Sequence, residues 1–451
     1  MKKIALILLA CVLLFNIAAC SSSSTPPASN PPSGNTESPT SESPTKTPDV
    51  DPPADPVTVS YWAMWNENET QALVFKEAIK RYEAATGNTV EVNWAGRDVR
   101  TNLKTAIDAG QKIDVIENSP DWFALTLGTD YLLNMDQYMD MKYASTGDQT
   151  LAQTLIPSLI DLARTYAGDG SVYYIPQQPS LAAMFYNKDV FDQAGVTSIP
   201  NTWDEFMAAC EKIKATGVYP MTVDDAYYSL LYSQYLMQMK GDKWTEDLVF
   251  DTTGELWADP ALLQMAQAMA EMRDKGYFSP ATGAQVFPSG QNEVATGITA
   301  MYFNGSWYPN EVAGTTGPDF NWGIMAFPNV PNATEPNTKY GFISQGFGIS
   351  PKSENPEAAA ELIAFLLAEQ TQQDLADQAV CIPATNGVEW PKTLAAAKLM
   401  FDNMTGAFAW SGNINNNPEI GPFFHEQFGK LLSGSIEPEQ FVSEMQAYAK
   451  G

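Results

Sequence analysis

The residues best suited to contact a small molecule stand at the end of one apolar stretch, Gly297 to Trp307. Ala300 to Phe303 is typical of a short buried strand, which stops at Asn304-Gly305 just before the indole of Trp307. A glycine allows close approach to the backbone, and an indole offers a flat apolar face beside it. This pattern predicts stacking on a ligand. The alternative is an ordinary strand and turn with a tryptophan in the core.

Aromatic, amide and charged residues also follow three earlier stretches that are typical of strands. They suit a sugar, because the CH-rich face of a pyranose stacks on an indole while its hydroxyl groups need donors and acceptors together. Singly they could be caps or turns: Asp98 is expected as an N-cap, and Asn118-Ser119-Pro120 could be a turn. Their recurrence favours a binding rim, made of Trp65, Asn66 and Glu67, then Arg97, then Asn118, Asp121 and Trp122.

The elements that must position this rim alternate between strand and helix. Apolar alternation predicts the strands, and a helical apolar face followed by glycine predicts each helix. Such alternation implies a parallel sheet covered by helices, in which ligands bind beyond the carboxyl ends of the strands. The elements are the strands 57–62, 89–94 and 113–117 and the helices 69–85 and 98–109.

Composition narrows the classes of function. The chain has 451 residues and a formal charge of −28, which would be near −30 without Lys2 and Lys3. Such a surface disfavours nucleic acid and anionic lipid as partners. The single histidine, His425, would have to carry any His-based zinc site or any Ser-His or Cys-His catalytic pair. It stands alone in an expected helix and is not expected to be a metal ligand. We expect no metal in the binding site and no cofactor.

The N-terminus is typical of a targeting segment. Lys2 and Lys3 precede an apolar run that is too short to span a membrane, and the segment closes at Cys20. It resembles a bacterial lipoprotein signal, 1–19, with a lipidated Cys20. The alternatives are a plain secretory signal or a buried cysteine without modification. Residues 20–56, rich in Ser, Thr and Pro, predict a disordered tether. We therefore expect a domain 57–451 held outside the cytoplasm by a lipid anchor.

Two cysteines remain in that domain, Cys210 and Cys381. A disulfide between them is compatible with an oxidising compartment. Cys210, however, shares an apolar helical face with Phe206 and Ile213, and Cys381 follows Ala379-Val380. Two buried thiols are the favoured interpretation.

Four later stretches give the chain a family resemblance. In order and spacing they are similar to the extracellular solute-binding proteins of ABC importers, in the sugar-binding family that includes the maltose-binding type. With them the resemblance covers essentially Val57 to the C-terminus. The stretches are Tyr186-Asn-Lys-Asp-Val190, Pro200-Asn-Thr-Trp-Asp-Glu205, Gly297 to Trp307, and Gly346-Phe-Gly-Ile-Ser-Pro351 with the helix 356–370 behind it.

The resemblance implies two α/β lobes, each a helix-covered sheet, with a cleft between them. Lobe one would hold about 57–167 and 299–342, and lobe two about 171–297 and 345–451. The chain would cross near 171–180, where two strand-like runs flank Pro176-Gln177-Gln178-Pro179, near Gly297, and near 344–348. It further implies a monomer that passes its solute to the transmembrane subunits of an ABC permease.

The resemblance also suggests which residues contact the solute. Trp307 and Trp410 would stack on sugar rings, and Asp121 would accept hydroxyl protons. Asn and Gln stand where the maltose-binding type uses other groups, which favours a different oligosaccharide, such as a β-linked xylo- or cello-oligosaccharide. The full set is Trp65, Asn66, Glu67, Arg97, Asn118, Asp121, Gln177, Gln178, Ser180, Asp225, Tyr227, Tyr228, Trp307 and Trp410.

Two other classes of protein remain open. A secreted glycosidase would use similar aromatic platforms but needs two carboxylates placed across the scissile bond, and Glu67, Asp121 and Asp225 are candidates. A binding protein for a peptide or metal is the other class. Carbohydrate binding without catalysis is the function that we expect.

Overall fold

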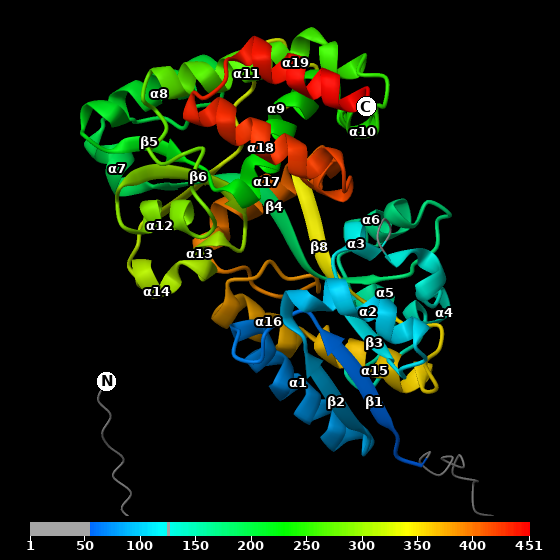
Figure 1. Cartoon of the computed structure of the whole chain (residues 1–451). Coiled ribbons are helices and arrows are strands. Elements are labelled where there is room, and N and C mark those ends of the chain that lie inside the picture. Colours follow the sequence, from blue (N-terminus) through cyan, green and yellow to red (C-terminus); the bar gives the residue numbers. More distant parts are fainter. Residues whose placement is uncertain (1–54, 124–126) are drawn as a thin grey trace, which may run out of the picture. The chain divides into compact units, whose positions relative to one another are not determined.

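The computed structural model describes residues 55–123 and 127–451. The expected signal segment, Cys20 and nearly all of the tether lie outside the described residues. The described strands form one nine-stranded sheet in the order β2-β1-β3-β8-β4-β6-β5, with β7 paired to β4 and β9 paired to β8. Helices pack around each end of this sheet, and the chain therefore forms two lobes (Figure 1).

The first lobe is built on three parallel strands, as the sequence predicts. Tyr61 of the central strand pairs with Val92 on one side and Val115 on the other. The elements of this lobe are β1 (Thr58–Ala63), α1 (Thr70–Thr86), β2 (Thr89–Trp94), the 3-10 helix η1 (Gly96–Asp98), α2 (Val99–Asp108), β3 (Val115–Asn118), α3 (Pro120–Trp122), η3 (Thr129–Tyr131), α4 (Asp136–Met139), α5 (Leu151–Thr154), α6 (Pro157–Ala167), α15 (Pro356–Leu366) and α16 (Glu369–Ala379).

The second lobe contains most of the remaining helices. The Thr202 side chain caps α8 by accepting the amide of Glu205, and the methionines of α11 are buried in the core. The elements are α7 (Lys188–Gln193), α8 (Trp203–Ala215), β5 (Tyr219–Thr222), η4 (Asp225–Tyr227), α9 (Tyr228–Lys240), α10 (Asp242–Val249), η5 (Leu256–Ala258), α11 (Pro260–Asp274), α12 (Ser289–Ala295), β6 (Thr299–Gly305), α13 (Tyr308–Glu311), α14 (Ala313–Thr316), β7 (Trp322–Met325), η6 (Lys392–Leu394), α17 (Ala395–Asp402), β9 (Gly406–Ala409), η7 (Trp410–Asn416), α18 (Ile420–Ser433) and α19 (Pro438–Ala449).

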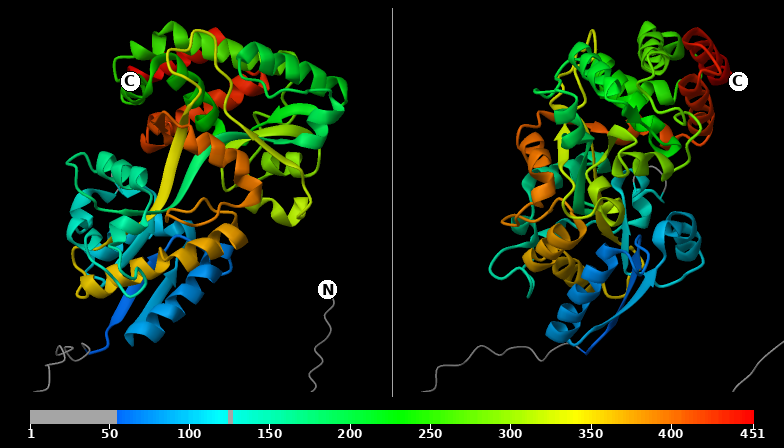
Figure 2. Two further views of the ribbon diagram at one scale, coloured as in Figure 1. Left: turned by 180° about the vertical axis from the view of Figure 1, so that it is seen from behind. Right: turned by 90° about the vertical axis from the view of Figure 1, so that its left-hand side faces the viewer.

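Two long antiparallel strands, β4 (Ile175–Asn187) and β8 (Lys339–Ile349), run from one lobe into the other. They lie side by side in both orientations of the molecule (Figure 2). The prolines in this region do not divide β4 into two runs, because the ladder only shifts its register between Pro176 and Gln178. Such an irregularity absorbs residues that cannot continue regular pairing.

The predicted return to lobe one after Gly297 does not occur. β6 pairs with β5 through Tyr219 and Thr299 and with β4 through Ala182 and Gly305, so it belongs to the second lobe. β7 also joins β4 there. The physical reason is that β4 continues beyond its crossing and offers pairing partners to both strands.

The assignment of all of 345–451 to lobe two is also corrected. α15 and α16 pack against α1: the Tyr82 hydroxyl donates to the Ala358 carbonyl (3.1 Å), and Arg81 donates to Thr371 (2.9 Å). Figure 1 shows α16 beside α1. The chain returns to the second lobe only after α16, through the segment that leads to α17.

Successive side chains of β4 point to opposite faces, so this one strand contributes to two apolar core clusters. Ala183 and Phe185 belong to the core cluster that continues from the first lobe, whereas Ala182 and Met184 belong to the cluster under α9 and α11. A strand buried on both faces is expected to be apolar at successive positions. The two cysteines of the described residues are free and buried in different clusters, Cys381 in the first and Cys210 in the second, which confirms the favoured interpretation.

Candidate functional site

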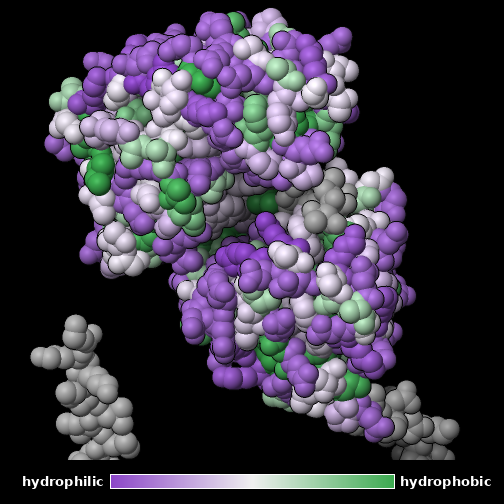
Figure 3. Space-filling view, viewed as in Figure 1, coloured by the Kyte–Doolittle hydropathy of each residue, from purple (hydrophilic) through white to green (hydrophobic). Residues whose placement is uncertain are grey.

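A cavity of about 1100 Å³ lies between the two lobes. The space-filling surface is largely hydrophilic and is hollowed between the lobes (Figure 3). Both lobes and both crossing strands contribute to the lining. The lining residues are Met64, Trp65, Asn68, Glu69, Thr70, Gln71, Arg97, Arg100, Trp122, Gln178, Ser180, Ala226, Tyr227, Trp307, Asn310, Glu311, Ile343, Gln345, Trp410, Asn415 and Pro418.

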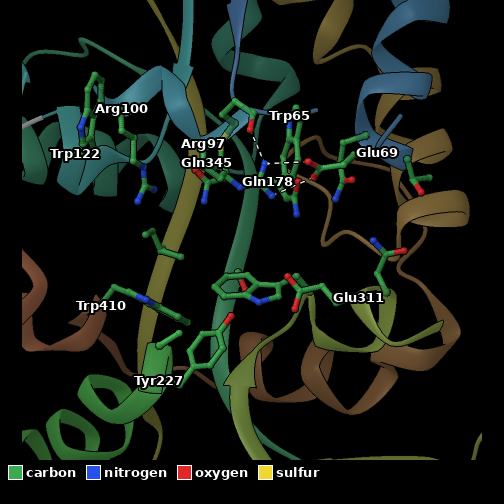
Figure 4. A pocket seen from close by; sticks show the side chains of 18 of the residues that line it. Trp65, Glu69, Arg97, Arg100, Trp122, Gln178, Tyr227, Glu311, Gln345 and Trp410 are labelled. Atoms are coloured by element: carbon green, nitrogen blue, oxygen red, sulfur yellow. Dashed lines mark hydrogen bonds and ion pairs between the residues drawn. The ribbon is translucent and has the colours of Figure 1, made fainter. Parts of the chain in front are cut away.

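The wall from the first lobe combines an indole with an ion pair. The guanidinium carbon of Arg97 lies 4.9 Å from the centroid of the Trp65 ring, within the range of a cation–π contact. Arg97 also forms an ion pair with Glu69 at 3.1 Å (Figure 4). The two charges therefore lie together at the rim of the cavity.

Behind this wall, the buried carboxylate of Glu117 holds the Trp65 indole in place. It accepts hydrogen bonds from the Tyr61 hydroxyl (2.6 Å), the Trp65 indole N–H (2.6 Å), the Gln177 amide (3.1 Å) and the Met64 backbone N–H (3.3 Å). Burial raises the pKa of Glu117 to about 7, although the hydrogen bonds and the Arg97 charge act in the opposite direction. Sequence reasoning missed this residue, because nothing in the sequence around Glu117, near the end of β3, signals that the carboxylate is buried.

The floor of the cavity is formed by the crossing strands. Gln178 of β4 pairs with Gln345 of β8 in the ladder. Among the described residues, the Oε1 atoms of Gln178 and Gln345 are buried without a hydrogen-bond partner. A buried acceptor without a partner costs free energy, so a hydroxyl donor that reached either oxygen would be favourable.

The wall from the second lobe is aromatic. The rings of Trp307 and Trp410 lie 5.2 Å apart at an angle of 47°. Tyr227 lines the cavity beside Trp410 (Figure 4). Ser180 fixes the turn before Trp307, because its Oγ accepts the Ser306 amide at 2.9 Å and lies 2.7 Å from the Ser306 hydroxyl. The turn that carries Trp307 is thus attached to a crossing strand.

Trp410 begins a turn with an uncommon backbone. Ser411, Gly412 and Asn413 all have positive φ angles, between 54° and 63°. A Cβ atom at Gly412 would lie 2.8 Å from the Thr245 methyl carbon, so the turn is packed closely against the second lobe. Residues held in sparsely populated backbone regions require a surrounding structure that fixes them, and they cluster at binding sites.

Glu311 stands on the second wall, opposite Arg97 and Glu69 (Figure 4). Its side chain remains open to the water of the cavity, yet the surrounding walls desolvate it and raise its pKa to about 7. The charge of Arg97 lowers this pKa, and that of Glu69 raises it further. Charges from both lobes therefore act on one another across the cavity.

His425 links two segments of the second wall. One ring nitrogen lies 3.1 Å from the Asp225 carbonyl oxygen and the other 2.9 Å from Oδ1 of Asn415. Burial lowers its pKa. As expected, it is a residue of a helix, α18. Within residues 55–123 and 127–451, no three His, Cys, Asp or Glu side chains are grouped so as to hold a metal ion.

The cavity brings together half of the residues predicted to contact a ligand. They come from both lobes and from β4, as the strand-end argument requires. They are Trp65, Arg97, Gln178, Ser180, Tyr227, Trp307 and Trp410.

Six other predicted residues lie outside the lining. Glu67 forms an exposed ion pair with Lys76, and Asn66 donates to Glu69. Asp225 accepts backbone amides of Ala226 and Phe287. The remaining three are buried: Asn118 accepts from Arg100, Gln177 donates to Glu117, and Tyr228 packs on Phe428.

The irregularity in β4 separates the directions of two neighbouring side chains. Gln177 has no ladder partner where the register shifts and donates to the buried Glu117, whereas Gln178 lines the cavity. The side chain of Asp121, in α3, is not among the described side chains. Asp98 precedes α2, but its side chain accepts no capping hydrogen bond.

The prediction also omitted several lining residues, including Glu69, Arg100, Glu311, Gln345 and Asn415. Arg100 could have been found, because it lies three residues after Arg97 and such residues share a helical face. Glu311 belongs to a single helical turn, α13, whose sequence carries no periodic signal. Among the described residues, no helix has the length and apolar character needed to cross a membrane.

Two α/β lobes that share crossing strands and enclose a polar and aromatic cavity define a binding protein that holds a solute between its lobes. The family model described as bacterial extracellular solute-binding protein matches residues 66–373. The chain belongs to this family, whose members are binding proteins.

Similar proteins agree with this assignment. The chain is 28% identical over 297 residues to a putative binding protein of Brucella abortus, which covers 65% of this chain and 68% of that protein. It is 26% identical over 312 residues to the lactose-binding protein of Rhizobium radiobacter. That match covers 66% of this chain and 68% of that protein. The fold matches that of a chitin oligosaccharide binding protein with a TM-score of 0.68, at 22% identity, over 88% of this chain and 98% of that chain.

Proposed function

We propose that this protein captures an oligosaccharide in the cavity between its lobes and delivers it to the permease of an ABC importer. The observation that carries the proposal is the combination of aromatic rings on both walls with buried amide acceptors on the floor. Sugar rings stack on the former, and their hydroxyl groups donate to the latter.

The cavity supports an oligosaccharide more than a single sugar. Its volume of about 1100 Å³ lies just above the usual range of ligand pockets, about 300–1000 Å³. Indoles stand on both walls, Trp65 and Trp122 on one and Trp307 and Trp410 on the other. We propose a β-linked ligand such as a xylo- or cello-oligosaccharide. The lactose-binding protein among the relatives, and the chitin oligosaccharide binding protein of similar fold, support this class of ligand.

Attachment to the cell surface is part of the same proposal. The sequence of 1–19 and Cys20 supports lipidation, and the Ser- and Pro-rich residues up to 56 support a tether. A monomer anchored in this way outside the cytoplasm would remain near the permease while its binding domain samples the surroundings. Membership of an extracellular family agrees with this location.

Two carboxylates in the cavity make a glycosidase the second candidate function. Glu69 and Glu311 face each other across the cavity, and the pKa of Glu311, at about 7, suits a general acid. Binding without cleavage remains our proposal, because the members of the family are binding proteins.

A thermal-shift screen with product analysis tests both functions. The domain from residue 57 onward would be mixed with xylo-, cello-, chito-, malto- and galacto-oligosaccharides, with sn-glycerol 3-phosphate as a non-sugar solute, and each mixture would then be chromatographed. A sugar at a hundred times its Kd adds about 2.7 kcal/mol of stability. A shift with the sugar recovered intact supports the proposal. Cleaved sugar indicates an enzyme, and no shift with any sugar contradicts carbohydrate binding.

A further inference from the structure

The Glu117 carboxylate connects three parts of the site. Its four hydrogen-bond donors come from β1 (Tyr61), from the loop after β1 (Met64 and Trp65) and from the crossing strand β4 (Gln177). Glu117 is fully buried and does not line the cavity. It therefore lies behind the site and contacts both the first wall and the strand that forms the floor.

We propose that Glu117 is a positioning residue that sets the affinity for the ligand by holding Trp65 and β4 in the geometry that the ligand requires. The inference rests on the proposed function, since it concerns the binding of a sugar in the same cavity. Glu117 contacts no ligand in this account. It acts through the Trp65 indole and through Gln177.

The position of Gln177 makes this connection effective. It lies where the register of β4 shifts, between Pro176 and Gln178, so regular ladder bonds do not hold this segment. The side-chain hydrogen bond to Glu117 supplies an attachment at that irregularity. The next residue, Gln178, faces the cavity floor. Loss of the attachment would therefore displace a residue of the floor.

The charge of Glu117 matters, because all four partners donate. An ionised carboxylate accepts all four hydrogen bonds, whereas a protonated or amide side chain carries hydrogens and must turn at least one donor away. An unsatisfied buried donor weakens the arrangement. Neutralisation should thus loosen the Trp65 indole and Gln177 together.

The same argument gives a dependence on pH. The titratable and charged groups that act on Glu117 are Tyr61 of β1 and Arg97 of η1. Because burial raises the pKa of Glu117 to about 7, the carboxylate takes up a proton near neutrality. Affinity for the sugar should fall as the pH falls through about 7.

The test compares wild type with Glu117→Gln, and uses Glu293→Gln as the matched control. Glu293 is a half-buried carboxylate in α12 that accepts from Ser279 and Gln285, has a raised pKa and does not line the cavity. Binding of xylotriose, cellotriose, chitotriose and maltotriose would be measured by calorimetry at pH 8 and pH 5.5. Glu311 titrates in the same range in all three proteins, so the informative quantity is the ratio of affinities at each pH.

At pH 8 we expect Glu117→Gln to bind roughly tenfold to a hundredfold more weakly than wild type, which corresponds to unsatisfied buried donors. At pH 5.5 the ratio should approach one, because Glu117 is then neutral in both proteins. Glu293→Gln should bind like wild type at both pH values. Equal affinities of wild type and Glu117→Gln at pH 8 would overturn the proposal, as would a ratio that stays the same at pH 5.5.

Hydrogen exchange provides a readout that needs no sugar. Glu117→Gln should exchange faster than wild type in the segments 64–66 and 175–180, while α11 exchanges equally in both. Unchanged exchange in both segments would refute the positioning role. If wild type binds no sugar of the screening panel but these segments still loosen, carbohydrate binding fails while Glu117 still positions Trp65 and β4.

Discussion

The indole of Trp307 lies directly over Gly305, so closely that a Cβ atom on Gly305 would be 2.5 Å from Cη2 of the ring. Real Cβ atoms do not approach other atoms this closely. Gly305 ends β6, and the missing side chain leaves the room that the indole occupies. The glycine thus fixes the direction in which Trp307 enters the cavity.

Gly305→Ala should therefore weaken ligand binding while the fold persists, because the new methyl group displaces the ring. Gly314→Ala is the matched control, since a Cβ atom there meets nothing within 4 Å. We expect the first variant to bind at least tenfold more weakly, a loss of about 1.4 kcal/mol, and the second to bind normally. Calorimetric titration with the sugar found in the screen measures both. Normal binding by Gly305→Ala would show that the orientation of the ring is unimportant.

Trp307→Ala should cost on the order of 2–4 kcal/mol of binding free energy, because it removes a large aromatic face from the second wall. Trp244→Ala serves as the control: this ring packs beside Lys240 in the second lobe and does not line the cavity. Its affinity should equal that of wild type. If Trp307→Ala kept full affinity, Trp307 would be a core residue, and stacking on the second wall would be refuted.

The stability of the domain should respond to pH through Glu117. Its folded-state pKa of about 7 lies above the ordinary value of 4.5, so between these pH values the folded state binds more protons than the unfolded state. The free energy of unfolding contributed by this group therefore falls as pH rises from 4.5 to 7. The loss is about 3 kcal/mol. Urea unfolding at several pH values should show a steeper decline in wild type than in Glu117→Gln, and parallel curves would contradict the prediction.

Acid should thus act in opposite directions on two properties of wild type. As Glu117 takes up a proton, this group stabilises the fold and weakens the hold on Trp65. A merely structural carboxylate would change the unfolding free energy without changing the affinity ratio between wild type and Glu117→Gln.

Cys210→Ala should leave binding intact and lower stability by about 1 kcal/mol. Cys210 is fully buried in α8, and Cys381 belongs to a different core cluster. A reducing agent should not shift the thermal midpoint of wild type, because the two thiols are free. A midpoint that falls on reduction would indicate a disulfide.

The first lobe was predictable from sequence because its signals are local. The strands and helices of 57–117 follow clear apolar periods, and their order implies the parallel sheet that the structure contains. Trp65 and Arg97 could be placed at the cavity from the same argument. Likewise, Trp307 could be found because an indole directly after a strand that ends in glycine is conspicuous in the sequence.

The assignment of the later segments to the two lobes was less predictable, because it depends on pairing between distant segments. The local sequence of Thr299 to Gly305 does not indicate that this strand pairs with β4. Likewise, the sequences of α15 and α16 do not indicate that these helices pack on α1. The direction of individual side chains was also beyond local signals, as Gln177 and Gln178 show. Glu117, the residue that organises the first wall, has no distinctive pattern around it.

The pairing of β3 with β8 has a kinetic consequence. It joins Val115 to Ile349, and the cavity needs residues from Met64 to Pro418. Contacts between such distant parts of a chain form slowly, because the entropy cost of closing the loop between them comes before the contacts can stabilise the structure. We expect the sheet of the first lobe to be completed late in refolding. The ability to hold a solute should appear with that slow phase, well after most of the helical content is regained.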